Sequence, residues 1–156
     1  MRGCLWLLPL ALVLSPGCRT RPDPAAAVRD GVRLFMETVA RDVTAHGPTA
    51  WRRHFADTPS FFMVSDGQMV FADSRSASEG IRALPQIIRQ IELNWGGNVR
   101  VDPLTPTLAS VATPYSEVLT DPQGHRTAAS GFFTGLAEYR NGQWQFRNAH
   151  WSTAAK

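Results

Sequence analysis

Two groups of residues in the second half of the chain have types and spacing suited to acid–base chemistry. Asn148, His150 and Ser152 alternate along one predicted strand and so share a face. A histidine with an ordinary pKa of about 6.5 suits a general base at neutral pH. Tyr115 and Glu117 alternate in the same way on an earlier strand, and they would form an acid–base pair if their face is inward. For His150, the alternative is a structural role in shaping the mouth of a pocket.

The last two predicted strands decide how the His150 group is arranged. Asn141-Gly142 between two alternating runs predicts a tight type I′ turn. That turn sets Phe133 opposite His150 and Gly135 opposite Asn148. The shared face then changes from aromatic near the turn, through small residues, to polar at the chain end. We interpret this face as the wall of a pocket with an apolar closed end and a polar mouth.

The candidate pocket also draws aromatic residues from other elements. Trp51 and Trp95 are placed to cap a ligand, and packing in the core is the alternative for both. His150 is the candidate catalytic residue. The full set of predicted pocket residues is Trp51, Phe62, Trp95, Tyr115, Phe133, Gly135, Phe146, Asn148 and His150.

Helices precede the sheet in the predicted order. Asp23-Pro24 begins a helix, with Asp as the N-cap and Pro at the first helical position, and Gly47-Pro48 ends it. A short second helix, ended by Thr58-Pro59, comes next, and a hairpin over residues 61–71 turns at Asp66-Gly67. The apolar residues of the first helix fall on one face at Val28, Val32, Phe35, Met36, Val39 and Val43.

A third helix and the main strands complete the domain. Ser76-Ala77-Ser78-Glu79 fits a capping box, and apolar residues at helical spacing continue to Ile91, with a kink expected at Pro85. Gly96-Gly97 ends this helix. The remaining strands are predicted at residues 99–101, 108–120, 127–140 and 143–153. This order predicts an α+β fold in which N-terminal helices pack on a strongly curved antiparallel sheet.

The first 17 residues have the layout of a secretory signal. Arg2 precedes an apolar run from Leu5 to Leu14, which is shorter than the roughly 20 residues that span a bilayer. The stretch that follows, Leu14-Ser15-Pro16-Gly17-Cys18, resembles a bacterial lipobox, whose cysteine is acylated and becomes the new N-terminus. We therefore predict a signal peptide at 1–17, a lipid-anchored tether at 18–24 and one domain at 25–156. Secretion without a lipid is the alternative.

Acylation at Cys18 would decide both the location and the redox chemistry of the protein. Arg19 follows it, and resemblance to lipoprotein sorting signals implies anchoring to the outer membrane, facing the periplasm. Cys4, the other cysteine, lies in the predicted leader. The acylated domain would therefore have no thiol for a disulfide or for nucleophilic attack.

Charge and ligand spacing argue against some classes of partner. The formal net charge is +3, and no Lys/Arg cluster with interleaved aromatics occurs, which argues against nucleic acid. His54 and Asp57 lie three residues apart on the short second helix, and a metal site needs more ligands than that. We expect neither a metal nor another cofactor.

Two stretches of the chain resemble parts of SnoaL-like, nuclear transport factor 2-like domains. These domains commonly finish with a strand, a tight turn, a Trp and a His-x-Ser end, as in the tail from Gly131-Phe132-Phe133-Thr134 to His150-Trp151-Ser152. Their second helix and first hairpin match the segment from Trp51 through Phe55-Ala56-Asp57 to Asp66-Gly67. The resemblance covers roughly residues 28–153 and implies a cone-shaped fold.

The resemblance implies no single activity, because the family includes isomerases, dehydratases, epoxide hydrolases, polyketide cyclases and non-catalytic binders. The ketosteroid isomerase type has an acid where this chain has Phe61-Phe62-Met63-Val64. The dehydratase type uses two histidines and acids, of which His150 alone is well placed, and we find no Asp-Arg-Asp set of the epoxide hydrolase type. Related domains often dimerise through the outer sheet face, so we expect a homodimer. The residues predicted on that face are Phe132, Leu136, Trp151 and Thr153.

Three functions stay open. The first is a membrane-tethered domain that binds a small, largely apolar molecule in a conical pocket. The second is a lyase, isomerase or hydrolase with His150 as general base, which a second ionisable group within hydrogen-bond reach of His150 would favour. The third is an interaction module that docks another envelope protein, which a cone without a cavity would favour.

Overall fold

The computed structural model describes residues 23–155. The predicted leader, the acylation site Cys18 and the tether up to residue 22 lie outside the described residues. The first helix, α1 (Pro24–His46), starts at Asp23, whose side chain accepts a hydrogen bond from the backbone N–H of Ala25. It ends at Gly47, where φ is 75°. Its predicted apolar stripe is buried, at Val28, Val32, Phe35, Met36, Val39 and Val43.

The short second helix follows α1 directly. The 3₁₀ turn η1 (Pro48–Ala50) leads into α2 (Trp51–His54), which buries Trp51. Within residues 23–155 no helix is both long enough and apolar enough to cross a bilayer.

The third helix differs from the prediction at its start. Helix α3 (Ser74–Ala83) begins two residues before the predicted capping box, because Asp73 is the N-cap. The Asp73 carboxylate accepts from the backbone N–H of Ser76, and the Ser76 hydroxyl accepts from the backbone N–H of Asp73. Ser76, which the sequence predicted to be the N-cap, is therefore the third residue of the helix and completes the capping box with Asp73.

The end of the predicted third helix is also wrong. The regular helix stops before Pro85, which lies in the single 3₁₀ turn η2 (Leu84–Gln86). Residues 90–95 then form strand β3 (Gln90–Trp95). Their apolar residues alternate inward, as period 2 requires, and these are Ile91, Leu93 and Trp95.

The described residues form one seven-stranded sheet with the order β2-β1-β7-β6-β5-β3, and β4 pairs with β5 off this path. All pairs are antiparallel except β1 with β7, which is parallel. The remaining strands are β1 (Phe62–Ser65), β2 (Gln68–Phe71), β4 (Arg100–Thr105), β5 (Leu108–Thr120), β6 (Arg126–Arg140) and β7 (Gln143–Thr153).

The two predicted tight turns have the backbone conformation that their sequences favour. Asp66 and Gly67 have φ of 49° and 81°, and Asn141 and Gly142 have φ of 50° and 83°. Positive φ at both central positions is the mark of a type I′ turn. Both turns therefore form as predicted.

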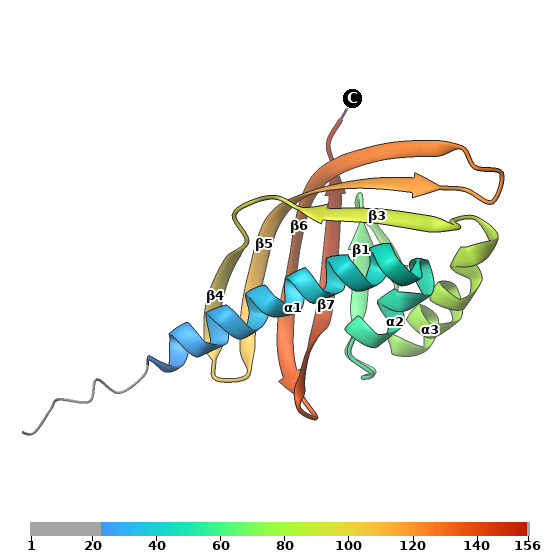
Figure 1. The fold of residues 1–156 in the computed structure, drawn as a ribbon. Coiled ribbons are helices and arrows are strands. Elements are labelled where there is room, and N and C mark those ends of the chain that lie inside the picture. The colour runs from blue at the N-terminus through green and yellow to red at the C-terminus, as the bar shows by residue number, and fades with distance from the viewer. Residues whose placement is uncertain (1–22, 156) are drawn as a thin grey trace, which may run out of the picture.

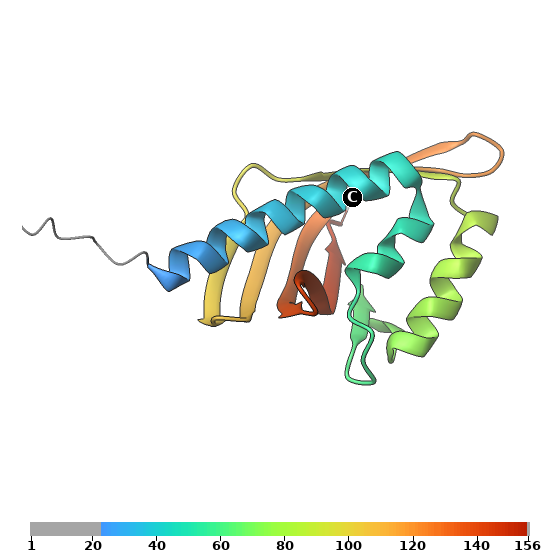
Figure 2. The same ribbon diagram turned by 60° about the horizontal axis from the view of Figure 1, so that its bottom comes forward.

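The helices cover one face of a strongly bent sheet. Figure 1 shows α1 crossing the strands, with α2 and α3 beside the β1–β2 hairpin. Figure 2 shows the same helices on one side of the sheet, with the long strands β5 and β6 bending over the top. The predicted α+β architecture, with N-terminal helices on a curved antiparallel sheet, is confirmed.

The register of the last hairpin changes at a β-bulge. Ala137 pairs with Phe146, as predicted, but Leu136 pairs with Asn148, so Arg147 is left without a partner residue in the β6–β7 ladder. Because side chains alternate with period 2, one extra residue turns every later side chain of β7 to the other face.

The bulge reverses several predicted orientations. Phe133 lies opposite Trp151 rather than opposite His150. Trp151 faces inward and is only 8% exposed, and Thr153 faces inward too, so the prediction that both lie on the outer face is wrong. The predicted inward orientation of Asn148 and His150 is wrong for the same reason.

Candidate ligand pocket

A pocket of about 370 Å³ lies against the inner face of the sheet, near the ends of β5 and β7, beside α3 and the β1–β2 hairpin. Most of its wall is apolar and comes from elements far apart in the sequence. The wall includes Trp51, Phe55, Met63, Phe71, Ile81 and Ile91. Distant parts of the chain therefore converge on one half-open pocket.

Trp151 is the centre of an aromatic floor. Its ring lies 5.6 Å from that of Trp51 and 4.7 Å from that of Tyr115, both edge-on. The ring of Trp95 stacks on that of Trp151 at 5.6 Å, and the ring of Phe133 packs edge-on against it at 4.8 Å. These are the tilted and offset arrangements that aromatic rings prefer. The floor is thus a packed cluster, and the free volume lies above it.

Gly135 serves the bulge rather than the pocket. A Cβ atom there would lie 2.8 Å from the backbone oxygen of Asn148 and 3.1 Å from Cζ of Phe133. Only glycine allows so close an approach of the neighbouring strand. The side-chain oxygen of Asn148 fills the interrupted ladder by accepting a 2.9 Å hydrogen bond from the backbone N–H of Leu136. The prediction that Gly135 leaves room for a ligand is therefore wrong.

The other predicted pocket residues fall into three places. Two line the pocket, Trp51 and Tyr115. Three are buried in the core instead, Trp95, Phe133 and Phe146. The remaining three line a shallow hollow on the outer face of the sheet, Phe62, Asn148 and His150. The prediction that Phe62 faces the pocket is wrong, because its neighbour Met63 takes the inward position on β1.

His150 is not placed to act on a molecule in the pocket. It is exposed on the outer face, and its side-chain contact among the described residues is a 3.4 Å approach of Nδ1 to the hydroxyl of Thr134. No second ionisable group lies within hydrogen-bond reach of it in residues 23–155. The role predicted for His150 as general base is therefore wrong for this pocket.

Polar groups gather at the mouth of the pocket. The Asp66 carboxylate accepts hydrogen bonds from the backbone N–H of Thr153 at 2.6 Å and from its hydroxyl at 3.0 Å. These bonds, the backbone one first, hold the pKa of Asp66 below its ordinary 3.8. Because the Thr153 hydroxyl donates to Asp66, it accepts from the hydroxyl of Tyr115, 3.4 Å away. Burial raises the pKa of Tyr115.

Glu117 and Tyr115 share the inward face of β5. An inward face was the condition under which the sequence predicted that these two residues could act as an acid–base pair. Its carboxyl is half-buried, and no described residue donates a hydrogen bond to it or forms an ion pair with it. Burial raises the pKa of Glu117 above its ordinary 4.5. A carboxyl group with a raised pKa can hold a proton nearer neutral pH, or it can receive a polar group of a ligand.

The charge of the lining is one-sided. Among the described residues around the pocket, two are acids, Asp66 and Glu117, and none is Lys, Arg or His. A ligand therefore meets apolar and aromatic walls with carboxyl groups near the opening.

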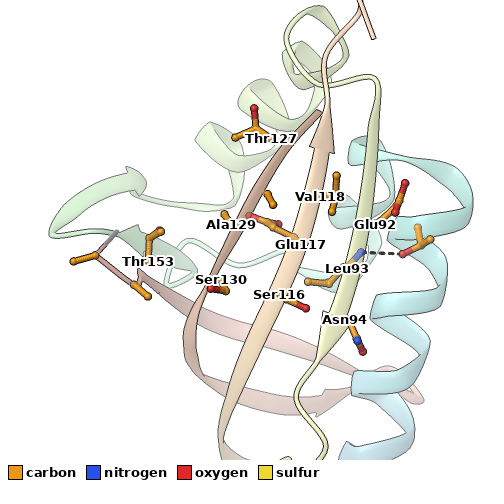
Figure 3. A pocket seen from close by; sticks show the side chains of 14 residues that line it. Glu92, Leu93, Asn94, Ser116, Glu117, Val118, Thr127, Ala129, Ser130 and Thr153 are labelled. Carbon is orange, nitrogen blue, oxygen red and sulfur yellow. Dashed lines mark hydrogen bonds between the residues drawn. The ribbon is translucent and has the colours of Figure 1, made fainter. Parts of the chain in front are cut away.

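A wider hollow of about 730 Å³ crosses β3, β5 and β6 (Figure 3). Glu117 borders both hollows, and Figure 3 shows it beside Ala129, its partner on β6. The Thr44 hydroxyl accepts from the backbone N–H of Leu93 at its edge. In the part of the chain that the structure describes, no aromatic ring lines this hollow. The pocket above Trp151 is lined by five aromatic rings, those of Trp51, Phe55, Phe71, Tyr115 and Trp151, so we take the smaller pocket as the site.

His54 and Asp57 do not converge on a common site. His54 is buried, with Nε2 3.1 Å from Oδ2 of Asp42, whereas Asp57 pairs with Arg52 at 2.9 Å. Burial lowers the pKa of His54. Across residues 23–155, no group of three His, Cys, Asp or Glu side chains is arranged to hold a metal ion.

Trp151 and Thr153 are pocket residues that sequence reasoning assigns to the wrong face. One signal is available in the sequence. An isolated glycine inside a strand, here Gly135, marks a bulge or a close backbone approach as often as it marks free volume.

Solved structures with the same architecture show which fold this is. A nuclear transport factor 2-like superfamily protein from Salmonella enterica matches with a TM-score of 0.70 and 12% identity, over 84% of this chain and 94% of that one. The fold is nuclear transport factor 2-like. A candidate scytalone dehydratase from Novosphingobium aromaticivorans matches with a TM-score of 0.71 and 11% identity, over 83% and 86%. A hexachlorocyclohexane dehydrochlorinase matches with a TM-score of 0.64 and 11% identity, over 83% of this chain and 87% of that one.

At these identities the likeness concerns the nuclear transport factor 2-like fold. No protein-family model and no curated protein matches the sequence. Nuclear transport factor 2-like domains include both ligand binders and enzymes, so the function has to be argued from the pocket itself.

Proposed function

We propose that this chain is a membrane-tethered domain that binds a small, largely apolar molecule in the pocket above Trp151. The observation that carries the proposal is the composition of the pocket. Its walls are apolar and aromatic, and its polar groups, Tyr115, Glu117, Asp66 and Thr153, converge at one end. Such an arrangement, in a volume of a few hundred Å³, is usual for small-molecule sites.

The tether in this proposal rests on the sequence around Cys18, outside the described residues. Pro24, at the start of α1, lies six positions after Cys18. A chain that short spans at most roughly 20 Å. An acylated Cys18 would therefore hold the start of α1 close to the membrane surface, and the pocket lies beside the far end of this 23-residue helix, roughly 35 Å away along its axis.

The test is to identify what the protein carries. The full chain is purified from a bacterial envelope, and the extract of the folded protein is analysed by mass spectrometry. Ala129→Phe fills the pocket from β6, and the matched control Ala128→Phe places the same ring on the opposite face of the same strand. We expect one apolar compound with the parent and with Ala128→Phe, and a loss with Ala129→Phe. Equal recovery from both variants would contradict binding in this pocket.

A second candidate function is acid–base catalysis, and Glu117 is the observation that favours it. Its carboxyl has no hydrogen-bond partner among the described residues, its pKa is raised by burial, and Tyr115 lies on the same face. Two neighbours of the fold have the names of elimination enzymes, a dehydratase and a dehydrochlorinase. Elimination starts with removal of a proton from carbon, which a carboxylate in an apolar site can perform.

Proton exchange at carbon tests this second function without a known substrate. The full chain is incubated with cyclohexanone in D₂O, and loss of the α-proton signal is followed by NMR. We expect the parent chain to exchange the α-protons faster than buffer alone does. Glu117→Gln should lose this acceleration, and Glu117→Asp should keep part of it. Exchange that is unaffected by Glu117→Gln would rule out Glu117 as the base.

The third hypothesis, an interaction module alone, is weakened by the presence of a cavity, because a cone without a cavity was the condition that favoured it.

A further inference from the structure

The pocket has an electrostatic character that its apolar walls do not require. Within residues 23–155, its lining contains two carboxyl groups and no basic side chain. A site for a fatty acid or another organic anion would need at least one positive or strongly donating group, since a buried anion without a partner is costly. The lining therefore disfavours anionic ligands.

The two carboxyl groups differ in how they are satisfied. Asp66 is exposed, and both of its oxygens accept hydrogen bonds from Thr153. Glu117 is half-buried on the pocket wall, and no described residue satisfies its carboxyl. Asp66 is thus occupied by the fold, while Glu117 is the acidic group left available to a ligand.

Aromatic faces surround the same space. Trp51, Tyr115 and Trp151 meet edge to face within 4.7–5.6 Å, and Phe71 contributes a further ring to the wall. Tryptophan and tyrosine rings attract an organic cation through their negative faces, and more strongly when water is excluded.

We propose that the ligand is a small apolar molecule bearing one protonated amino group, and that Glu117 is its counter-ion. This inference rests on the proposed binding function and names the class of ligand. The apolar part lies against the aliphatic and aromatic walls, and the ammonium lies near Glu117, where it supplies the partner that the carboxyl otherwise lacks.

Three probes of equal chain length separate charge from apolar contact. They are octylamine, octan-1-ol and octanoate, each titrated at pH 7 into the full chain carrying Cys18→Ser. Because Trp51 and Trp151 line the pocket, tryptophan fluorescence reports occupancy. We expect octylamine to bind at least about tenfold more tightly than octanoate, the ratio that one modest charge interaction gives, with octanol between them.

Matched variants locate the effect. Glu117→Gln should remove the preference for octylamine but keep octanol binding, and Glu117→Asp should restore part of the preference. The control is Glu92→Gln, which removes an acid that lies outside the pocket and pairs with Arg126 at 2.9 Å. It should leave the preference unchanged.

The outcomes separate this inference from the function on which it rests. Equal binding of the three probes, or tighter binding of octanoate, would overturn the amine proposal while leaving an apolar pocket. A preference that survives in Glu117→Gln would overturn the role of Glu117. If no probe binds and the purified protein carries no compound, the proposed binding function itself fails.

Discussion

Asp66 accepts hydrogen bonds from both the backbone N–H and the hydroxyl of Thr153, 87 positions further along the chain. One short side chain therefore joins the turn of the first hairpin to the end of the last strand. This junction forms the mouth of the pocket, because Asp66 and Thr153 both line it.

Removing this junction should loosen the pocket mouth. Asp66→Ala is expected to lower the midpoint of thermal unfolding at pH 7 and to speed hydrogen–deuterium exchange at the amide of Thr153. In the folded state the pKa of Asp66 is held below its ordinary 3.8. The ionised carboxylate therefore stabilises the fold above pH 3.8, and this stabilisation is lost as the pH falls through the pKa of the folded state. The parent and the variant should thus converge in stability at the most acidic pH. A difference that persists there would contradict a role for the ionised carboxylate.

Gly135 should tolerate no side chain. A methyl group there meets the backbone oxygen of Asn148 at 2.8 Å. Gly135→Ala is expected to destabilise the fold by about 1–3 kcal/mol, the usual cost of overpacking, which lowers the thermal midpoint by roughly 3–10 °C. Gly97→Ala is the control, because nothing lies within 4 Å of the position that a Cβ atom would take there. Equal midpoints for the two variants would show that the bulge can relax.

His54 should make the fold sensitive to mild acid. Burial lowers its pKa in the folded state below the ordinary 6.5, so the unfolded chain binds a proton first as pH falls. Stability should therefore decrease as pH drops below about 6.5. The thermal midpoint measured from pH 8 to pH 5 should fall less steeply in His54→Gln. A slope in His54→Gln equal to that of the parent would contradict the role of the buried imidazole.

Self-association through the outer sheet face stays a prediction, with a smaller apolar patch than the sequence indicated. Trp151 and Thr153 face inward, but Phe132 is 47% exposed and Phe62 is 38% exposed. Phe132→Glu, measured by sedimentation in the full chain with Cys18→Ser, should turn a dimer into a folded monomer. A parent chain that is already monomeric at tens of micromolar would contradict the prediction. Trp151→Glu is unsuitable for this test, because it would break the aromatic core.

Acylation of Cys18 also stays a prediction. Cys18→Ser should move the protein from the membrane fraction to the soluble fraction, because one residue carries the whole anchor. Mass spectrometry of the parent should find the lipid on an N-terminal Cys18. A variant that remains in the membrane fraction would show that another segment holds the protein there.

Local signals in the sequence are enough to predict the elements that depend on neighbours in the chain. Asp23-Pro24 and Gly47 bound α1 as predicted, and both type I′ turns form at Asn-Gly and Asp-Gly. Strand β3 is the exception, because its isoleucine continues the helical spacing of α3 and so favours helix. Only the alternation of Ile91, Leu93 and Trp95 distinguishes it as a strand.

The site is harder to predict, because its geometry depends on one unpaired residue in a long ladder. A two-residue turn fixes the register near Asn141, and the isolated Gly135 is a local sign of an irregular ladder, but it does not show that Arg147 is the residue that leaves the pairing. That single insertion exchanges Trp151 for His150 on the inner face. The Tyr115–Glu117 pair can be named from alternation alone, whereas its inward direction depends on the packing of β5 against the helices.

The parallel pairing of β1 with β7 has a consequence for the order in which the protein folds. Phe62 pairs with Asn148, so the first hairpin joins the sheet only through the last strand. Contacts so distant in sequence form more slowly than contacts between neighbouring strands, because the loop-closure entropy must be lost before they form. We therefore expect the β5–β6–β7 meander, whose strands are neighbours in sequence, to assemble first. The pocket would then be the last part of the molecule to take shape, when the β1–β2 hairpin docks along β7.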